Sequence, residues 1–316
     1  MPAISAKAPG KIILFGEHAV VYGRPAIAVP IDQVHVRVAI FAQPRVESGS
    51  VRIQAPDINL DARLDELPVD HPIVFTINQL TGTLGISHLP ACTIRISSTI
   101  PVASGLGSGA AVSIAALRAL SNFLGRPLPD DKVNQLAYEV ETLHHGTPSG
   151  VDNTVITYVQ PVYFLLGEPI RILRVPIPFI VLIGDTGITA PTTESVADVR
   201  RGWEGNPVKF EAIFDEIGEI TESARNRIEG GAPNRIGNLM NANHKLLQKM
   251  GVSSSELDGL VAAACDAGAL GAKMSGGGRG GNMIALVTPD TTEPVSEALL
   301  ENGAVRIIVS EINNNV

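Results

Sequence analysis

The sequence predicts an α+β fold in two domains. At 316 residues the chain is long, and chains beyond about 250–300 residues usually divide because a single hydrophobic core stops growing. Apolar residues alternate with period two in some segments and recur at three and four in others, which indicates strands and helices. Pro176 and Pro178 precede an apolar strand, so we expect one domain at 1–178 and a second at 179–316.

The N-terminal domain is expected to mix strands and helices. Alternating apolar residues predict strands at 34–40, 51–55 and 93–97. Helical spacing follows over 110–124 and again over 133–143. The order of these elements favours helices packed against a sheet.

The C-terminal domain is expected to pack helices on an antiparallel sheet. Helical spacing covers 210–220 and 236–250, and Gly251 is a suitable C-cap. Ser253 and Glu256 have capping-box spacing for the next helix. The last elements are expected to be a strand, a helix and a strand, at 283–287, 292–301 and 305–309.

Composition excludes several classes of function. Hydrophobic residues make up 45% and charged residues 18%, as in ordinary folded chains, and the formal net charge is -8. An acidic chain without a basic run is not expected to bind nucleic acid or an anionic membrane. Only two cysteines occur, without metal-like spacing, and we read no secretion signal. We therefore expect a cytoplasmic protein.

The stretch PVASGLGSGAA at 101–111 has the form of an anion site. Its glycines allow positive φ and close backbone approach, and a helix follows at once. Backbone N–H groups and the helix dipole then converge on one point, which favours a phosphate. A tight loop without a ligand is the alternative.

A dinucleotide-binding oxidoreductase is the rival from another class. Gly105, Gly107 and Ala110 satisfy a relaxed form of the dinucleotide fingerprint. The segment TIPVAS separates them from the preceding strand, and Asp130 and Asp131 stand at a helix start instead of a strand end. The sequence therefore disfavours this rival.

A second glycine-rich stretch, KMSGGGRGGN at 273–282, lies between a helix and a strand. Ordering so many glycines is unfavourable, which indicates that the backbone itself approaches something closely. A flexible connection is the alternative.

Together with APGKIILFGEHAVVYGRPAIAVPID at 8–32 and HHGTPSGVDN at 144–153, these stretches occur in an order that resembles the GHMP small-molecule kinases. The extended GEH segment, PSGVDN and the helix LMNANHKLLQKMGVSSSELDGLV resemble the mevalonate branch of that family.

The resemblance implies an N-terminal domain like domain 2 of ribosomal protein S5 and a ferredoxin-like C-terminal domain. It implies transfer of the ATP γ-phosphate to the C5 hydroxyl of mevalonate with Mg²⁺. The partners would be mevalonate and ATP, with a homodimer left open. A related acceptor, as in the phosphomevalonate kinase or mevalonate 3-kinase type, is the alternative within the family.

The resemblance also assigns residues. It makes Asp152 the carboxylate that takes or orients the hydroxyl proton, Lys11 a cation at the reacting phosphate, and Glu141 and Ser108 the candidates for Mg²⁺. ATP would bind Pro101, Val102, Ala103, Ser104, Gly105, Leu106, Gly107, Ser108, Gly109 and Ala110. Mevalonate would contact Lys11, Glu17, His18, Asp152, Thr192, Gly277 and Gly278.

Each role has a structural alternative. Asp152 could cap a turn, Lys11 could extend to solvent from a strand end, and Glu141 could lie in solvent on a helix. His18 could be a satisfied structural histidine, and Thr192 could be a helix N-cap.

Two features depart from the family pattern. Gly109 stands where relatives usually carry the second serine of a pair, so a metal contact there would be lost or would pass to Ser108 or water. Arg279 and Asn282 stand where relatives more often have a small or apolar residue and a cysteine. For Arg279, a phosphate contact and a solvent-facing position both stay open.

Overall fold

The computed structural model describes residues 3–101, 104–145, 148–189 and 192–314. For His144, His145 and Thr192 the description covers the backbone only. No helix in these ranges is both long and apolar enough to cross a membrane.

The chain forms two compact units, each assembled from separate segments. Unit 1 comprises Met1–Gly10, Val34–Pro101 and Gly107–Tyr158, and unit 2 comprises Lys11–Gln33, Val102–Leu106 and Val159–Val316. Strands β1 (Ile4–Phe15) and β2 (Ala26–Ala42) contribute residues to both units. The expected boundary near residue 178 is a single cut in the sequence, and it stays a prediction.

Unit 1 contains a mixed sheet in the order β4-β3-β5-β2. Its strands beside β2 are β3 (Val51–Ala55), β4 (Leu60–Arg63) and β5 (Cys92–Ser98). Strand β5 runs antiparallel to β2, with Val38 opposite Ile96, and parallel to β3. The alternation that predicted these strands is the alternation of buried and exposed side chains on them.

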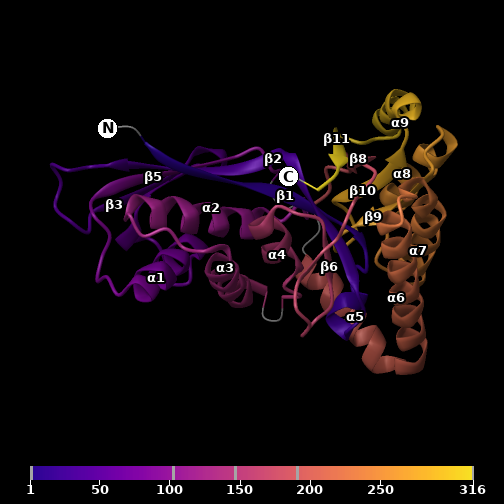
Figure 1. Cartoon of the computed structure of the whole chain (residues 1–316), viewed down its shortest axis with the longest axis horizontal. Coiled ribbons are helices and arrows are strands. Elements are labelled where there is room, and N and C mark those ends of the chain that lie inside the picture. Colours follow the sequence, from indigo (N-terminus) through magenta and orange to yellow (C-terminus); the bar gives the residue numbers. More distant parts are fainter. Residues whose placement is uncertain (1–2, 102–103, 146–147, 190–191, 315–316) are drawn as a thin grey trace. The chain divides into compact units, whose positions relative to one another are not determined.

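Helices of unit 1 lie along this sheet (Figure 1). They are α1 (Pro72–Leu84), α2 (Ser108–Phe123), α3 (Asp130–His145) and α4 (Val151–Tyr158), beside short 3-10 turns at Pro56–Ile58 and Leu64–Glu66. The predicted apolar stripe of α2 is buried, with Ile114, Leu117 and Leu120 fully enclosed. Helices α1 and α4 were not predicted.

Unit 2 contains an antiparallel sheet in the order β11-β8-β10-β9. The strands are β8 (Phe179–Asp185), β9 (Gly271–Ser275), β10 (Asn282–Val287) and β11 (Arg306–Ile312). Strands β6 (Val162–Phe164) and β7 (Arg171–Ile172) extend the edge of β2. All residues of β9 and β10 are buried, so their charged and polar members need partners.

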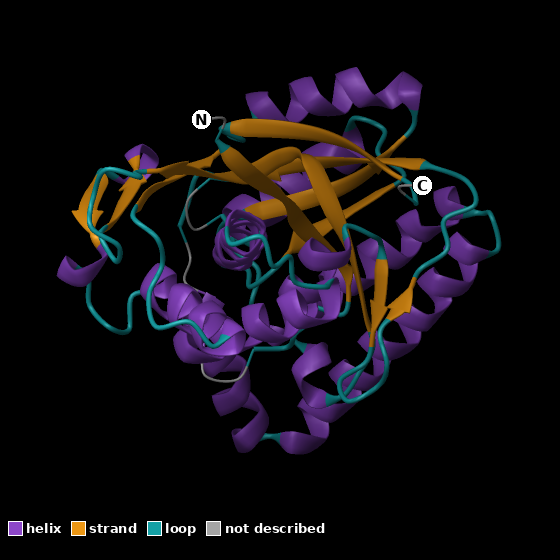
Figure 2. Cartoon of the chain, turned by 60° about the vertical axis from the view of Figure 1, so that its left-hand side comes forward, coloured by secondary structure: helices purple, strands orange, loops and turns teal. Residues whose placement is uncertain are grey.

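Helices and sheets pack within each unit (Figure 2). Those of unit 2 are α5 (Thr192–Gly205), α6 (Pro207–Glu229), α7 (Gly237–Met250), α8 (Ser255–Asp266) and α9 (Pro289–Glu301), with 3-10 turns η1 (Ala19–Tyr22) and η4 (Pro233–Ile236). Gly251 caps α7 in the left-handed conformation, as predicted. The predicted N-cap of α8 is wrong by one residue, because Ser254 accepts the N–H of Leu257 while Ser253 donates to Asp258.

Candidate active site

The first glycine stretch leads directly into α2, as an anion site requires. Gly107 is the N-cap residue at φ 77°, a conformation that favours glycine, and it provides no capping side chain. The first turn of α2 holds no acidic residue. Its leading N–H groups and the positive end of its dipole are therefore available to an anion.

Glu141 of α3 lies against this helix start. A Cβ atom added at Gly109 would come within 3.2 Å of its carboxylate oxygen Oε1. The missing side chain at Gly109 thus leaves room for the carboxylate beside Ser108, which begins α2. Glu141 is half-buried at this position.

Asp152 lies in the first turn of α4 and is half-buried. Pro148, Ser149 and Gly150 precede this helix, which begins at Val151. Asn153 beside it is buried and donates to the side chain of Asn134 on α3 at 2.6 Å. This contact holds the start of α4 to α3, which also carries Glu141.

Lys11 belongs to unit 2, where it contacts the other half of the first glycine stretch. The lysine is 4% exposed, and its Nζ donates to the carbonyl of Gly105 at 3.2 Å. Its backbone N–H donates to the carbonyl of Leu106 at 3.0 Å. A solvent-facing lysine is therefore excluded, and the ammonium group lies at the glycine backbone.

The second glycine stretch packs against its own unit. At φ 83°, a Cβ atom on Gly278 would lie 1.9 Å from the carbonyl oxygen of Val252. The N–H of Arg279 donates to that same carbonyl at 2.8 Å. The close approach predicted from the sequence is thus an approach to another part of the chain.

Arg279 is an exposed residue that is tied to a neighbouring helix, and a phosphate contact for it stays a prediction. Its guanidinium forms an ion pair with Asp198 of α5. Its backbone has a φ of 62°, which is unusual for a residue other than glycine. The pair connects the second glycine stretch to the helix that begins at Thr192.

Asn282 connects the two glycine stretches within unit 2. Its side-chain Nδ2 donates to the carbonyl of Ser104 at 2.5 Å, and both residues are buried. A Cβ atom on Gly281 would meet the same carbonyl at 3.2 Å. This departure from the family pattern therefore provides an amide donor to the 104–106 segment.

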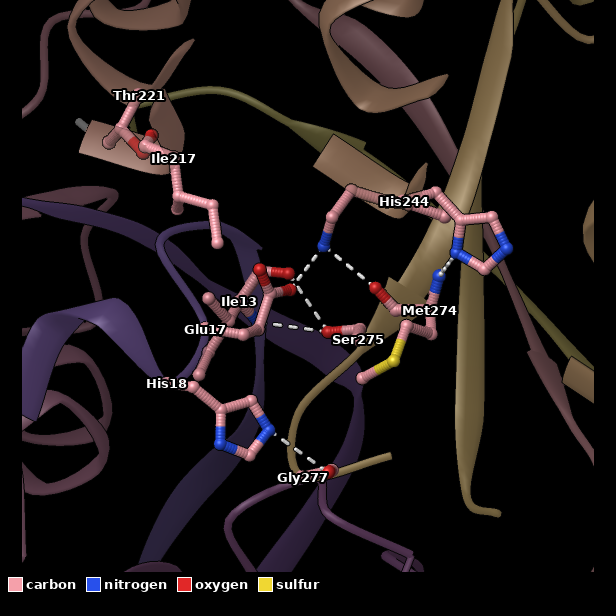
Figure 3. A network of polar contacts seen from close by, with 10 residues as sticks. Ile13, Glu17, His18, Ile217, Thr221, His244, Met274, Ser275 and Gly277 are labelled. Carbon is pink, nitrogen blue, oxygen red and sulfur yellow. Dashed lines mark hydrogen bonds and ion pairs between the residues drawn. The ribbon is translucent and has the colours of Figure 1, made fainter. Parts of the chain in front are cut away.

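A buried ion pair joins the GEH segment to β9 (Figure 3). Lys273 is fully buried, and its Nζ contacts the Glu17 carboxylate and donates to the carbonyl of Met274 at 2.7 Å. Burial raises the pKa of Glu17 and lowers that of Lys273, and each charge partly offsets the effect on the other. Glu17 is therefore held inside the unit by a fixed partner.

His18 is a neutral group at physiological pH. Burial lowers the pKa of its imidazole to about 4, and its Nε2 lies 3.1 Å from the carbonyl of Gly277, to which it donates (Figure 3). The remaining ring nitrogen can then only accept a hydrogen bond. This state suits a hydroxyl donor better than a carboxylate.

The remaining predicted residues differ in burial and in how far the structure describes them. Pro101 is half-buried, and Leu106 and Ala110 are buried. Val102 and Ala103 lie outside the described residues, and Thr192 is the first residue of α5. Glu141 and Asp152 belong to unit 1 and Lys11 to unit 2, so their convergence stays a prediction.

Sequence reasoning missed Lys273 and Asp198. Lys273 had a detectable signal, because a lysine within a short apolar strand must find a counter-charge if the strand is buried. Asp198 had no detectable signal, because its role depends on the contact that Arg279 makes with α5 in the folded chain.

Comparison with known proteins identifies the family. The model for the GHMP kinases N terminal domain matches residues 73–160, and that for GHMP kinases C terminal matches 220–305. A mevalonate kinase of Thermococcus sibiricus is 37% identical over 96% of this chain and 95% of its own length. One of Pyrococcus horikoshii is 36% identical over 96% and 94%. The chain belongs to the GHMP kinases.

Solved structures agree with this assignment. The mevalonate kinase of L. major, in complex with R-mevalonate, matches with a TM-score of 0.82 at 30% identity, covering 100% of this chain and 97% of that one. The enzyme of Methanococcus jannaschii matches with a TM-score of 0.84 at 26% identity, covering 100% and 99%. The expected two-domain α+β class is confirmed.

This GHMP kinase is accordingly an ATP-dependent small-molecule kinase. The dinucleotide-binding alternative is set aside, because the sheet of unit 1 contains antiparallel neighbours and is not a doubly wound parallel sheet.

Proposed function

We propose that this GHMP kinase transfers the γ-phosphate of ATP to the C5 hydroxyl of (R)-mevalonate. The observation that carries the proposal is its 37% identity to a mevalonate kinase over 96% of the chain. The open helix start at Gly107 and the lysine at Gly105 support it, because phosphoryl transfer depends on positioning and on charge stabilisation.

Asp152 would accept or orient the proton of the attacking hydroxyl. Lys11 would stabilise charge that develops on the transferred phosphoryl group, since its ammonium already lies at the glycine backbone expected to cradle the phosphates. His18 would accept a hydrogen bond from a substrate hydroxyl.

Mg²⁺ would be held by Glu141 and Ser108 together with the phosphates of ATP. The residues fit, because the Glu141 carboxylate borders the start of α2, where an anionic phosphate is favoured. Within the described residues no group of three or more acidic, histidine or cysteine side chains could hold a metal. Mg²⁺ in kinases needs only one or two carboxylates beside the phosphates, and it neutralises their charge.

The two cations of the second glycine stretch favour an unphosphorylated acceptor. Lys273 is committed to Glu17, and Arg279 to Asp198. A phosphorylated acceptor would be expected to need additional cations in its pocket. Neither of these two side chains is available for that purpose without breaking an ion pair.

The acceptor is tested by an ADP-release assay with mevalonate, phosphomevalonate, galactose and homoserine. We expect the highest kcat/KM with mevalonate and no turnover without ATP. Stronger turnover of any other acceptor would overturn the substrate assignment.

The catalytic role is tested with Asp152→Asn, for which we expect kcat to fall by about 10²–10⁴. Circular dichroism should show an unchanged fold. Glu141→Gln should raise the Mg²⁺ concentration needed for half-maximal rate, while Glu139→Gln on the same helix serves as the matched control. Equal behaviour of the two glutamate variants would contradict the metal assignment.

We also infer a cytoplasmic location, which the two free cysteine thiols favour. Light scattering on the purified protein would distinguish a monomer from a homodimer.

A further inference from the structure

A concave site lies in unit 2 and contains none of the residues assigned above. It has a volume of about 670 Å³ and forms where α6 ends, η4 passes and α7 begins. Its polar lining comes from Arg227, Arg235, Asn226, Asn234 and Asn238. Small-molecule sites usually fall between about 300 and 1,000 Å³, so the size is sufficient for a metabolite.

The lining is cationic although the chain is acidic. The formal net charge is -8, yet two guanidinium groups and three amides line this site and no carboxylate does. Within the described ranges, no acidic side chain forms an ion pair with Arg227 or Arg235. Their charge is therefore available to an incoming anion.

The backbone at this site also favours an anion. Helix α7 continues directly from η4 and has no acidic residue in its first turn, so no side chain there offsets the positive end of its dipole. The end of α6 contributes little opposing charge. The carbonyls of Asn226, Ile228 and Arg227 already accept the N–H groups of Gly230, Gly231 and Ala232.

The site is fixed in place from two sides. A guanidinium nitrogen of Arg227 donates to the carbonyl of Arg235, which holds η4 against α6. A Cβ atom on Gly237 would lie 2.1 Å from the carbonyl oxygen of Leu270, so the start of α7 is packed tightly against the entry to β9. These contacts fix the backbone of the site, and a preorganised backbone loses less conformational entropy on binding.

We propose that this site binds a small phosphorylated metabolite through its phosphate or diphosphate group. Arg227, Arg235 and the start of α7 contact the anion, and the three asparagines serve polar groups on the rest of the molecule. Guanidinium groups match phosphate oxygens in geometry and charge. The volume exceeds what a bare phosphate needs, and the remaining space accommodates the organic part.

Calorimetric titration with pyrophosphate tests the proposal on the full-length enzyme saturated with Mg²⁺ and a non-hydrolysable ATP analogue. Saturation blocks the nucleotide site, so binding that persists belongs elsewhere. We expect one binding event, weakened about tenfold or more in Arg235→Gln, because a lost hydrogen bond to a charged group has roughly that effect. Arg306→Gln, an exposed arginine on β11, removes the same charge and should bind as the wild type does.

Absence of binding to the saturated wild-type enzyme would overturn the proposal, as would equal weakening in Arg235→Gln and Arg306→Gln. Arg227→Gln also removes the contact with η4, so its folding must be checked, whereas no hydrogen bond of the Arg235 side chain is needed for the described fold. Anomalous diffraction from crystals soaked in tungstate, a phosphate mimic, provides a second test. A peak between Arg227 and Arg235 is expected, and its absence contradicts the site.

Discussion

The two glycine-rich stretches look alike in the sequence and differ in the structure. A Cβ atom on Gly105, in the first stretch, would meet nothing within 4 Å. In the second, a Cβ atom on Gly278 would lie 1.9 Å from the carbonyl oxygen of Val252, and one on Gly280 would lie 2.6 Å from that of Ile188.

Glycine therefore serves two purposes in one chain. In the first stretch it permits positive φ at Gly105 and Gly107, and the space beside Gly105 is open. In the second it lets the backbone pack against other backbone, which positions Gly277 for His18 and Arg279 for Asp198. A run of glycines by itself does not distinguish the two purposes.

The sharpest test of this difference compares Gly278→Ala with Gly105→Ala. Both positions have positive φ, but only Gly278 is also sterically blocked. We expect Gly278→Ala to lower the free energy of unfolding by about 4 kcal/mol, from backbone strain and overpacking together. Gly105→Ala should lower it by only about 1 kcal/mol. Equal losses in urea denaturation would refute the comparison.

The next largest effect is expected at the strand that leads into the second stretch. Lys273→Met leaves the buried Glu17 carboxylate without its counter-charge, which should destabilise the protein by about 3 kcal/mol. The double variant Glu17→Gln with Lys273→Met removes both charges and should regain much of that loss. A double variant no more stable than Lys273→Met alone would argue against an uncompensated charge as the cause.

The burial of His18, which contacts Gly277, makes the stability of the protein depend on pH. Burial lowers the pKa of His18 from 6.5 to about 4, so between these values the unfolded chain binds a proton that the folded chain does not. Stability should therefore fall with decreasing pH in this window, by about 2 kcal/mol at pH 5. Asparagine tolerates the positive φ at this position, so His18→Asn is a suitable variant. Between pH 7 and pH 5, its free energy of unfolding in urea should fall by about 2 kcal/mol less than that of the wild type. Parallel pH profiles would contradict this.

The smallest effect is expected at Arg279. Its side chain is 39% exposed and that of Asp198 is 27% exposed, so the ion pair should contribute only about 0–1 kcal/mol. A double-mutant cycle with Arg279→Gln and Asp198→Asn measures the coupling directly. A coupling well above 1 kcal/mol would show that the second stretch depends on this pair, and not mainly on its packed glycines.

Much of the fold could be predicted from periodicity. The stripes at 110–124 and 236–250 correspond to α2 and α7, and the alternation at 34–40 corresponds to part of β2. Helix α4 was missed because HHGTPSGVDN consists largely of turn-forming residues, although its last residues begin the helix. The local signal there was too short to show a helical period.

The candidate site was predicted unevenly. Motifs named Lys11, Glu141 and Asp152, but not the contacts that surround them. The approach of Glu141 to Gly109 joins residues from two helices, and the bond from Asn282 to Ser104 joins residues 178 positions apart. No local pattern encodes such pairs.

The sequence by itself determined the family, the α+β class, most helices and strands, and the glycine conformations that a ligand or a packed loop requires. Local spacing is enough for these, because periodicity and backbone freedom are properties of short segments. Only the tertiary structure decided that Lys273 is paired with Glu17 and that Arg279 is held by α5. It also decided that the space beside Gly105 is open while that beside Gly278 is filled. Burial and charge pairing depend on which distant segments meet, and the folded chain alone determines that.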